Sequence, residues 1–297
     1  MRRLLPTQVG LWAAVVLLSA PATSHGAEDI DLTPSIAAGD LSHVALELEV
    51  GGDLKVRDQS EAKKNNEQGP EKTVPMSVNG TVEYDERLLP GDEGALPQRS
   101  VRFYRSGNAV LKVDEGGETR TLPAGVKLVL VDAREGRPAI VSAAGPLQRD
   151  ELDLIDLVGN TTIIHELLPS KTVADGETWP MDSALAQKIL GLDSVASCEV
   201  QSVVDEVNSG FVRIRFTGSV NGAVDGAATE LLLQGVYLFD RKARRINQLN
   251  LAIKEIRSIS PASPGLDVVA KLRIKVKPLA ESTELSDEVL GELPSEI

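Results

Sequence analysis

The sequence predicts a mainly β fold of the β-rich α+β class, with long curved antiparallel strands in two halves joined by short helices, half-barrel or sandwich-like in form. Two observations support this. Apolar residues alternate with polar ones over long stretches in both halves of the chain, whereas helical spacing is confined to the middle. With 297 residues, the chain is long enough for one large domain or for two of ordinary size.

The N-terminus has the features of a secretory signal peptide, predicted to span residues 1–26. Arg2 and Arg3 precede a short apolar run, Val9 to Leu18, and small residues follow it. Cleavage is expected after Ala22 or near Gly26. Residues 27–40 are then an acidic linker, and we expect an exported protein, periplasmic or extracellular.

Charge and cysteine content restrict the partners and the compartment chemistry. The formal net charge is −13, which argues against a nucleic-acid partner because a polyanion would be repelled over most of the surface. A single cysteine, Cys198, excludes an internal disulfide. No second long apolar stretch follows the leader, so the sequence predicts no transmembrane anchor in the mature chain.

The N-terminal β half is predicted over residues 41–147. Val44, Leu46, Leu48 and Val50 share one face of a first strand, and the same parity continues beyond Gly51-Gly52, which indicates a bend in one long strand. A mobile loop is expected at 57–72, followed by a second long strand over 74–84 that pairs with the first. Shorter strands are expected at 101–103, 111–113, 126–131 and 140–141.

Residues 148–191 form the predicted helical joint. A helix is expected over 148–158, and a second short helix starts at Asp182 or Ser183 and stops at Gly191. Between them lies a proline-framed turn with one large aromatic residue, which we interpret as a structural hub. Its residues are Pro169, Val173, Gly176 and Trp179.

The C-terminal β half is predicted over residues 192–277. A hairpin joins 200–204 to 212–216, and further strands are expected at 230–240, 249–253 and 272–276. Residues 278–297 carry acids and no Lys or Arg, so they are expected to be a solvated acidic tail with at most a loose helix near Val289-Leu290. Whether the halves form one sheet or two domains stays open.

Candidate chemistry is sparse. His43 and His165 belong to no H-x-H or H-x-x-x-H pairing and are interpreted as structural. Cys198 has no basic neighbour in sequence that would lower its pKa, and is expected to be inert. The acidic pair Asp153 and Asp156 lies in a predicted helix without an aromatic platform. We therefore expect no catalytic residues, no metal and no cofactor, and hence no enzyme.

One group of charged residues suggests a binding face. Basic residues alternate along the strands of the C-terminal half in a chain that is otherwise acidic, as expected for a surface that meets an anionic partner. An ordinary solvated outer face is the alternative. The residues are Arg213, Arg215, Arg241, Arg244, Arg245, Lys271, Arg273, Lys275 and Lys277.

The pattern Leu168-Pro169, Val173 and Gly176-x-x-Trp179 resembles a group of secreted bacterial proteins of unknown function. The hairpin from Phe239 to Ile246 is loosely similar to the half-barrel lipoprotein carriers of the LolA type. The second resemblance implies a curved antiparallel sheet that holds a lipid against helices.

Two functions follow as hypotheses. The first is an exported, non-catalytic protein that binds a lipid or another apolar envelope ligand on the concave side of a bent sheet. The alternative is a protein-interaction or structural module of the cell envelope with no small ligand, which meets an envelope protein through its basic face or acidic tail. A continuous apolar cavity would favour the first, and a packed core the second.

Overall fold

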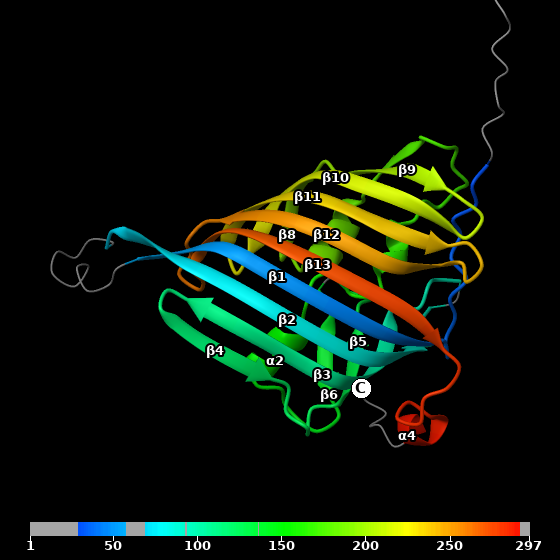
Figure 1. Cartoon of the computed structure of the whole chain (residues 1–297), viewed down its shortest axis with the longest axis horizontal. Helices are drawn as coiled ribbons and strands as arrows, with labels where there is room; N and C mark the ends of the chain where they lie inside the picture. The colour runs from blue at the N-terminus through cyan, green and yellow to red at the C-terminus, as the bar shows by residue number, and fades with distance from the viewer. Residues whose placement is uncertain (1–28, 58–68, 93, 136, 292–297) are drawn as a thin grey trace, which may run out of the picture.

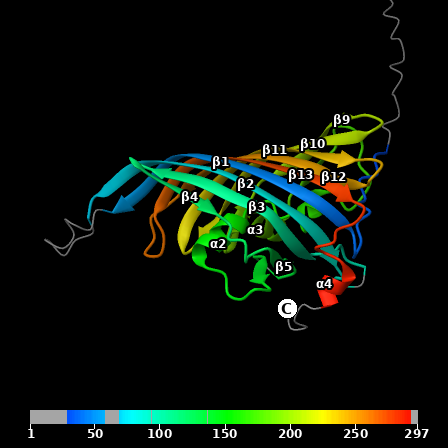
Figure 2. The ribbon, with the colours of Figure 1, turned by 60° about the horizontal axis from the view of Figure 1, so that its bottom comes forward.

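The computed structural model of the protein describes residues 29–57, 69–92, 94–135 and 137–291. The predicted signal peptide, most of the predicted loop at 57–72 and the last six residues lie outside this part of the chain. The described residues form one antiparallel sheet that arches over a few short helices (Figures 1 and 2). The prediction of a mainly β fold with long antiparallel strands is confirmed.

Thirteen strands can be assigned in the described part of the chain. Their order across the sheet is β6-β5-β3-β2-β1-β13-β12-β11-β10-β9-β7, with β4 added to β3 and β8 added to β10. Their bounds are β1 Leu41–Arg57, β2 Glu71–Leu89, β3 Arg99–Val113, β4 Gly116–Thr121, β5 Leu128–Asp132, β6 Ala139–Ser142, β7 Thr178–Pro180, β8 Ser194–Cys198, β9 Gln201–Val207, β10 Phe211–Val224, β11 Ala227–Asp240, β12 Arg245–Arg257 and β13 Gly265–Leu279.

The first two strands behave as their alternation predicts. β1 continues through Gly51-Gly52 without a break and pairs with β2 along its whole length. The bend requires glycine at position 52, where φ is 149° and a Cβ would lie 2.3 Å from the Asp267 carbonyl oxygen of β13.

The other edge of β1 joins the two halves of the chain. β1 pairs with β13 in register from Leu41 opposite Leu279 to Lys55 opposite Gly265. The first strand and the last strand are therefore neighbours at the centre of one continuous sheet. This settles the question that the sequence left open, because the two halves share a single sheet.

β3 differs from the sequence prediction of two short strands at 101–103 and 111–113. It is one strand, and Gly107 pairs with Val82 of β2 in its middle. The pairing shifts register at Glu83/Tyr84, where an extra residue is accommodated. Ser106-Gly107-Asn108 resembles a turn locally, but two flanking strands supply its hydrogen-bond partners, and these override the local preference.

A helical layer covers the inner face of the sheet, which is the concave side in Figure 2. It consists of α2 (Arg149–Ile155), the 3₁₀ helix η1 (Ile164–Leu167) and α3 (Ser183–Leu190). α2 ends three residues before the predicted end at 158, and α3 begins and ends as predicted. Buried side chains of these helices and of both sheet halves form one continuous apolar core, which includes Ile164, Leu190, Val44 and Ile274.

The acidic tail differs from its prediction. Residues 280–291, here called the C-terminal strap, follow β13 and end in the short helix α4 (Asp287–Gly291), in agreement with the expected helix near Val289-Leu290. The strap is not fully solvated, however, because Leu285 has no exposed surface. Leu285 packs against an apolar patch on the outer face of the sheet. The composition of the tail gives no sign of that contact.

Candidate functional site: a trough on the outer face

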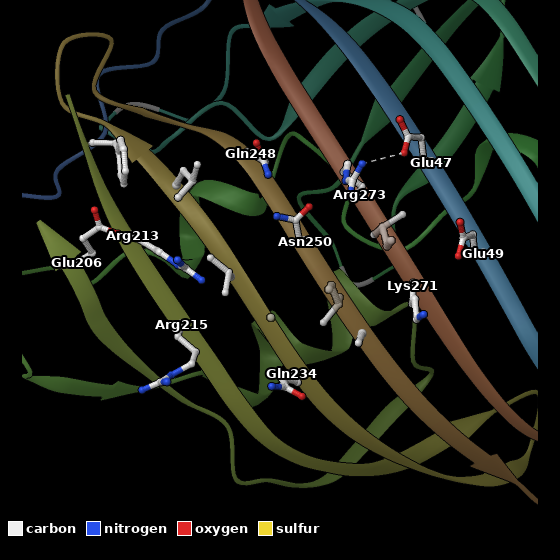
Figure 3. A pocket seen from close by; sticks show the side chains of 17 residues that line it. Glu47, Glu49, Glu206, Arg213, Arg215, Gln234, Gln248, Asn250, Lys271 and Arg273 are labelled. Carbon is white, nitrogen blue, oxygen red and sulfur yellow. Dashed lines mark hydrogen bonds and ion pairs between the residues drawn. The ribbon is translucent and has the colours of Figure 1, made fainter. Parts of the chain in front are cut away.

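A shallow trough of about 660 Å³ lies on the outer face of the sheet, which is the face away from the helices (Figure 3). It lies over β10, β11, β12 and β13, with β9 and β1 at its margins. The twist of a wide antiparallel sheet produces such a hollow along one diagonal.

The trough is built from transverse rows of side chains that the strand register brings side by side. One row runs Arg215, Val236, Asn250, Arg273 from β10 to β13, and the adjacent row runs Arg213, Leu238, Gln248, Lys275. Both rows begin and end with a cation and carry one apolar and one amide side chain between. With strands about 4.8 Å apart, the two cationic banks are about 14 Å apart at the backbone.

A third row has one cationic end. It runs Thr217, Gln234, Ala252, Lys271, so Lys271 extends the bank on β13. Consecutive rows are two residues apart along each strand, which is about 6.8 Å. In Figure 3, Gln234, Gln248 and Asn250 lie between Arg213 and Arg215 on one side and Lys271 and Arg273 on the other.

The cations on the banks are only loosely neutralised. Arg213 and Arg215 share one carboxylate, Asp205, at nitrogen–oxygen distances of 3.3 and 3.7 Å. Arg273 lies 3.4 Å from Glu47. All three arginine side chains are about half exposed. Such surface pairs contribute little to stability, so their guanidinium donors are available to a ligand.

The floor combines apolar and polar groups. Val236 and Leu238 are half-buried and point outward from β11. The residues that alternate with them on β11 are buried on the inner face. Gly235, directly before Val236, faces inward, because a Cβ there would lie 2.2 Å from the Phe216 ring. The amides of Gln234, Gln248 and Asn250 form no hydrogen bond with another side chain within the described residues. The trough thus offers hydrocarbon contact and hydrogen-bond donors together.

The structure divides the predicted basic face into two groups. Arg213, Arg215, Lys271 and Arg273 line the trough, and Lys275 and Lys277 continue the same outer face of β13. The turn between β11 and β12 has another role. There Arg244 pairs with Asp31 at 2.8 Å and Arg245 with Asp40 at 2.7 Å, so these arginines fasten the segment before β1.

Arg241 belongs to that turn as well, and it donates a hydrogen bond to the Asn208 carbonyl oxygen.

The sequence analysis did not identify the uncharged residues of the trough. Gln234, Gln248, Asn250, Val236 and Leu238 carry no chemical motif. Their alternation on β11 and β12 was a usable signal, but it needed the pairing order β10-β11-β12-β13 to place them between two cationic strands.

The concave side, where the sequence suggested an apolar ligand, is occupied by the helical joint. The cavity between α2, α3 and the sheet measures about 260 Å³ and is lined by paired charges. Arg137 lies 2.6 Å from Asp156, and Arg257 lies 2.5 Å from Glu255. These short pairs neutralise Arg137 and Arg257.

A buried polar cluster lies beside this cavity. Arg102 donates to Glu86 at 2.8 Å, and Thr161 donates to the same carboxylate oxygen at 2.8 Å. Both charged side chains are about 95% buried. Burial raises the pKa of Tyr104, whose hydroxyl also lies in this part of the core, although the positive charge of Arg102 opposes the shift.

His165 and His43, the two histidines within the described residues, are both held by polar contacts. His165 is buried in η1, and its Nδ1 accepts a hydrogen bond from the Ile246 N–H at 3.3 Å. Burial, with the nearby charge of Arg245, lowers the pKa of His165 to about 3. The Nδ1 of His43 lies 2.9 Å from Asp85 on the outer face. The described residues contain no group of three or more His, Cys, Asp or Glu side chains that could hold a metal ion.

The hub is arranged around one carbonyl oxygen. The indole N–H of Trp179 and the hydroxyl of Tyr237 both donate to the Leu167 carbonyl, at 3.0 and 2.9 Å. Val173 pairs with Ile30 in an isolated bridge, and Gly176 takes a positive φ of 75°. Cys198 is half-buried nearby, and burial raises the pKa of its thiol.

No protein-family model matches the chain, and no curated protein matches it. Among solved structures, lipovitellin in a study of lipid–protein interactions is similar with a TM-score of 0.41 and 10% identity over 83% of this chain. This chain spans 26% of that one. An outer membrane channel from Pseudomonas putida F1 has a TM-score of 0.22 and 6% identity, covering 82% of this chain and 98% of the other. At these scores neither similarity indicates a shared function.

Within the described residues, no helix is both long and apolar enough to cross a membrane.

Proposed function

We propose that this chain is an exported, non-catalytic protein of the cell envelope that binds an anionic amphiphile in the outer-face trough. The ligand class is a lipid or another apolar envelope component with an anionic headgroup. The observation that carries this proposal is the row pattern, in which cations on β10 and β13 flank apolar and amide side chains on β11 and β12.

Electrostatics favours an anionic ligand at this location. The chain as a whole has a net charge of −13, so it repels anions at long range. The trough lining carries four cations, Arg213, Arg215, Lys271 and Arg273, and three carboxylates, Glu47, Glu49 and Glu206, on the marginal strands β1 and β9. An anionic headgroup is therefore favoured where it contacts the half-exposed guanidinium groups directly, since salt screens more distant charges. Arginine also binds phosphate or carboxylate oxygens with two parallel hydrogen bonds.

The floor accounts for the apolar part of the ligand. Val236 and Leu238 are half-buried in the free protein, and Phe211 lies at the end of the trough. Covering this surface with a hydrocarbon chain yields about 25 cal/mol for each Å² of apolar area removed from water. Thr217, at the end of the third row, has a hydroxyl that donates to the Leu233 carbonyl oxygen at 3.2 Å. Among the described residues, no His or Cys lines the trough beside it, which supports binding as the role.

The proposal is tested with short-chain phosphatidylglycerol and phosphatidylcholine of equal chain length, below their micelle concentrations, by isothermal titration calorimetry. We expect the full chain to bind the anionic lipid about tenfold more tightly, since the headgroup charge meets both banks. The double variant Arg215→Gln/Arg273→Gln removes one cation from each bank and should abolish this preference.

The matched control is Arg149→Gln, which removes an exposed arginine on α2, away from the trough. Its lipid binding should equal that of the unchanged chain. Equal affinity for both headgroups, or an unaltered preference in the double variant, would contradict the proposal and favour a module that meets another protein.

A further inference from the structure

A separate apolar patch lies beneath the C-terminal strap, on the outer face of β1, β2, β3 and β5. Apolar residues gather there that are separate from the main core: Leu41, Leu89, Val101, Phe103, Leu128 and Leu130. Leu285 of the strap is completely buried against them, and Leu290 packs at the margin.

Two arginines beside the patch hold the strap. Arg87 donates to the Leu285 carbonyl oxygen at 2.8 Å and pairs with Asp287. Arg105 lies 3.8 Å from Glu284. The surface thus recognises a leucine with a carboxylate immediately before it and another two residues after it, in the sequence Glu284-Leu285-Ser286-Asp287.

The strap is held weakly compared with the strands. α4 has no buried residue, the Asp287 side chain is 91% exposed, and Leu285 is the strap's one fully buried side chain within the described residues. Segments with few buried contacts and exposed ion pairs open locally, without unfolding of the whole molecule.

The sheet beneath the strap is complete without it. Asp85 is buried, and its carboxylate is bonded by Arg105 and lies 2.9 Å from His43. Burial would raise the pKa of Asp85, but these hydrogen bonds outweigh it and lower the pKa below its ordinary value. Removal of the strap would therefore leave this buried charge paired and expose an apolar patch flanked by Arg87 and Arg105.

We propose that this patch is a docking surface for an acidic, leucine-containing segment of another protein, and that the strap is its displaceable internal occupant. The chemistry of the strap defines that of the partner: one leucine in the apolar patch and carboxylates on Arg87 and Arg105. This inference is independent of the proposed trough function, because the two surfaces share no residue.

The test uses the full-length chain and a fluorescent peptide that corresponds to residues 279–291, followed by fluorescence anisotropy. In the variant Leu285→Ser the strap is released. We expect the peptide to bind this variant about tenfold more tightly than the unchanged chain, where the strap competes for the site. A peptide that carries the same Leu285→Ser change should bind about tenfold more weakly.

The matched control is Glu288→Gln, which alters an exposed acid of the strap and should leave peptide binding unchanged. Adding Arg87→Gln to the Leu285→Ser variant should weaken the peptide by about threefold or more, because a cation is lost beside the patch. Absence of binding to folded Leu285→Ser, or equal binding of both peptides, would overturn the proposal.

A second measurement remains decisive if Leu285→Ser does not fold. In the unchanged chain, the Leu290 amide, which donates to Ser286, should exchange its hydrogen much faster than amides of β13. Exchange of the strap only through global unfolding would show a fixed structural segment and overturn the proposal. A concentration-dependent dimer that is lost in Leu285→Ser would also overturn it, by assigning the site to a second copy of this chain.

Discussion

Single residues determine how the core tolerates polar groups. His165 is neutral in the folded protein because a charged imidazole would be buried beside Arg245, and its Nδ1 must remain unprotonated to accept the Ile246 N–H. Trp179 and Tyr237 converge on one carbonyl oxygen in the same region. His165, which the sequence analysis interpreted as structural, is part of the packed core.

His165 makes stability depend on pH. Its pKa is about 3 when folded, against an ordinary value of 6.5, so between these values the unfolded chain binds one more proton. The contribution of the neutral His165 to the free energy of unfolding is therefore complete above about pH 6.5. It is lost as the pH falls below that value, by up to about 1.4 kcal/mol per pH unit. Urea unfolding of the unchanged chain and of His165→Asn at pH 5 and pH 7 measures this.

The amide oxygen of Asn can accept the Ile246 N–H without binding a proton. Between pH 7 and pH 5, we expect the free energy of unfolding of His165→Asn to fall by about 2 kcal/mol less than that of the unchanged chain. An identical loss in both proteins would assign the acid sensitivity to other groups.

At the scale of single elements, local signals worked where the element makes its own contacts. α3 begins as the sequence predicts because the Asp182 side chain accepts a hydrogen bond from the Ala184 N–H at 2.7 Å. It ends at Gly191, whose φ of 67° suits glycine. β3 and the strap were the exceptions, since neighbours distant in sequence determine both.

The cap of α3 gives a direct test. Asp182→Ala should destabilise the protein by about 1 kcal/mol, because an N-terminal N–H loses its acceptor. Asp182→Asn retains a side-chain oxygen at the same place and should cost only a few tenths of a kcal/mol. Chemical denaturation of the three proteins makes the comparison. Equal losses in both variants would show that the cap hydrogen bond is not what stabilises the start of α3.

At the scale of the whole molecule, the ladder between β1 and β13 makes the two halves interdependent. One apolar core extends from Val129 in the N-terminal half to Ile274 in the C-terminal half. A continuous core of this kind predicts a single cooperative unfolding transition.

Val129→Ala tests this coupling from a distance. In a Trp12→Phe background, Trp179 is the single tryptophan and reports on the joint. Val129 has no exposed surface, so its truncation should lower the free energy of unfolding by about 2 kcal/mol. The unfolding midpoints measured by fluorescence and by far-UV circular dichroism should then fall together. Val141→Ala, exposed on the adjacent strand, should change neither midpoint appreciably. Separate transitions would indicate two independent halves.

The basic residues show which parts of the candidate site could be predicted from the sequence. Alternation placed Arg213, Arg215, Lys271 and Arg273 on outward positions, and all four line the trough. Arg244 and Arg245 appeared equivalent in sequence, yet they pair with Asp31 and Asp40 of the segment before β1. The difference arises because local sequence does not show which acids a folded chain brings to each cation.

The sequence by itself determined the antiparallel β architecture, the helical joint with its tryptophan hub and the outward position of the basic residues. Each depends on periodicities of two or 3.6 residues and on turn chemistry, which are local properties. Only the tertiary structure decided that β1 pairs with β13, that amides lie between two cationic strands and that Leu285 is buried. These depend on contacts between segments far apart in the chain, where strand order and register select the neighbours.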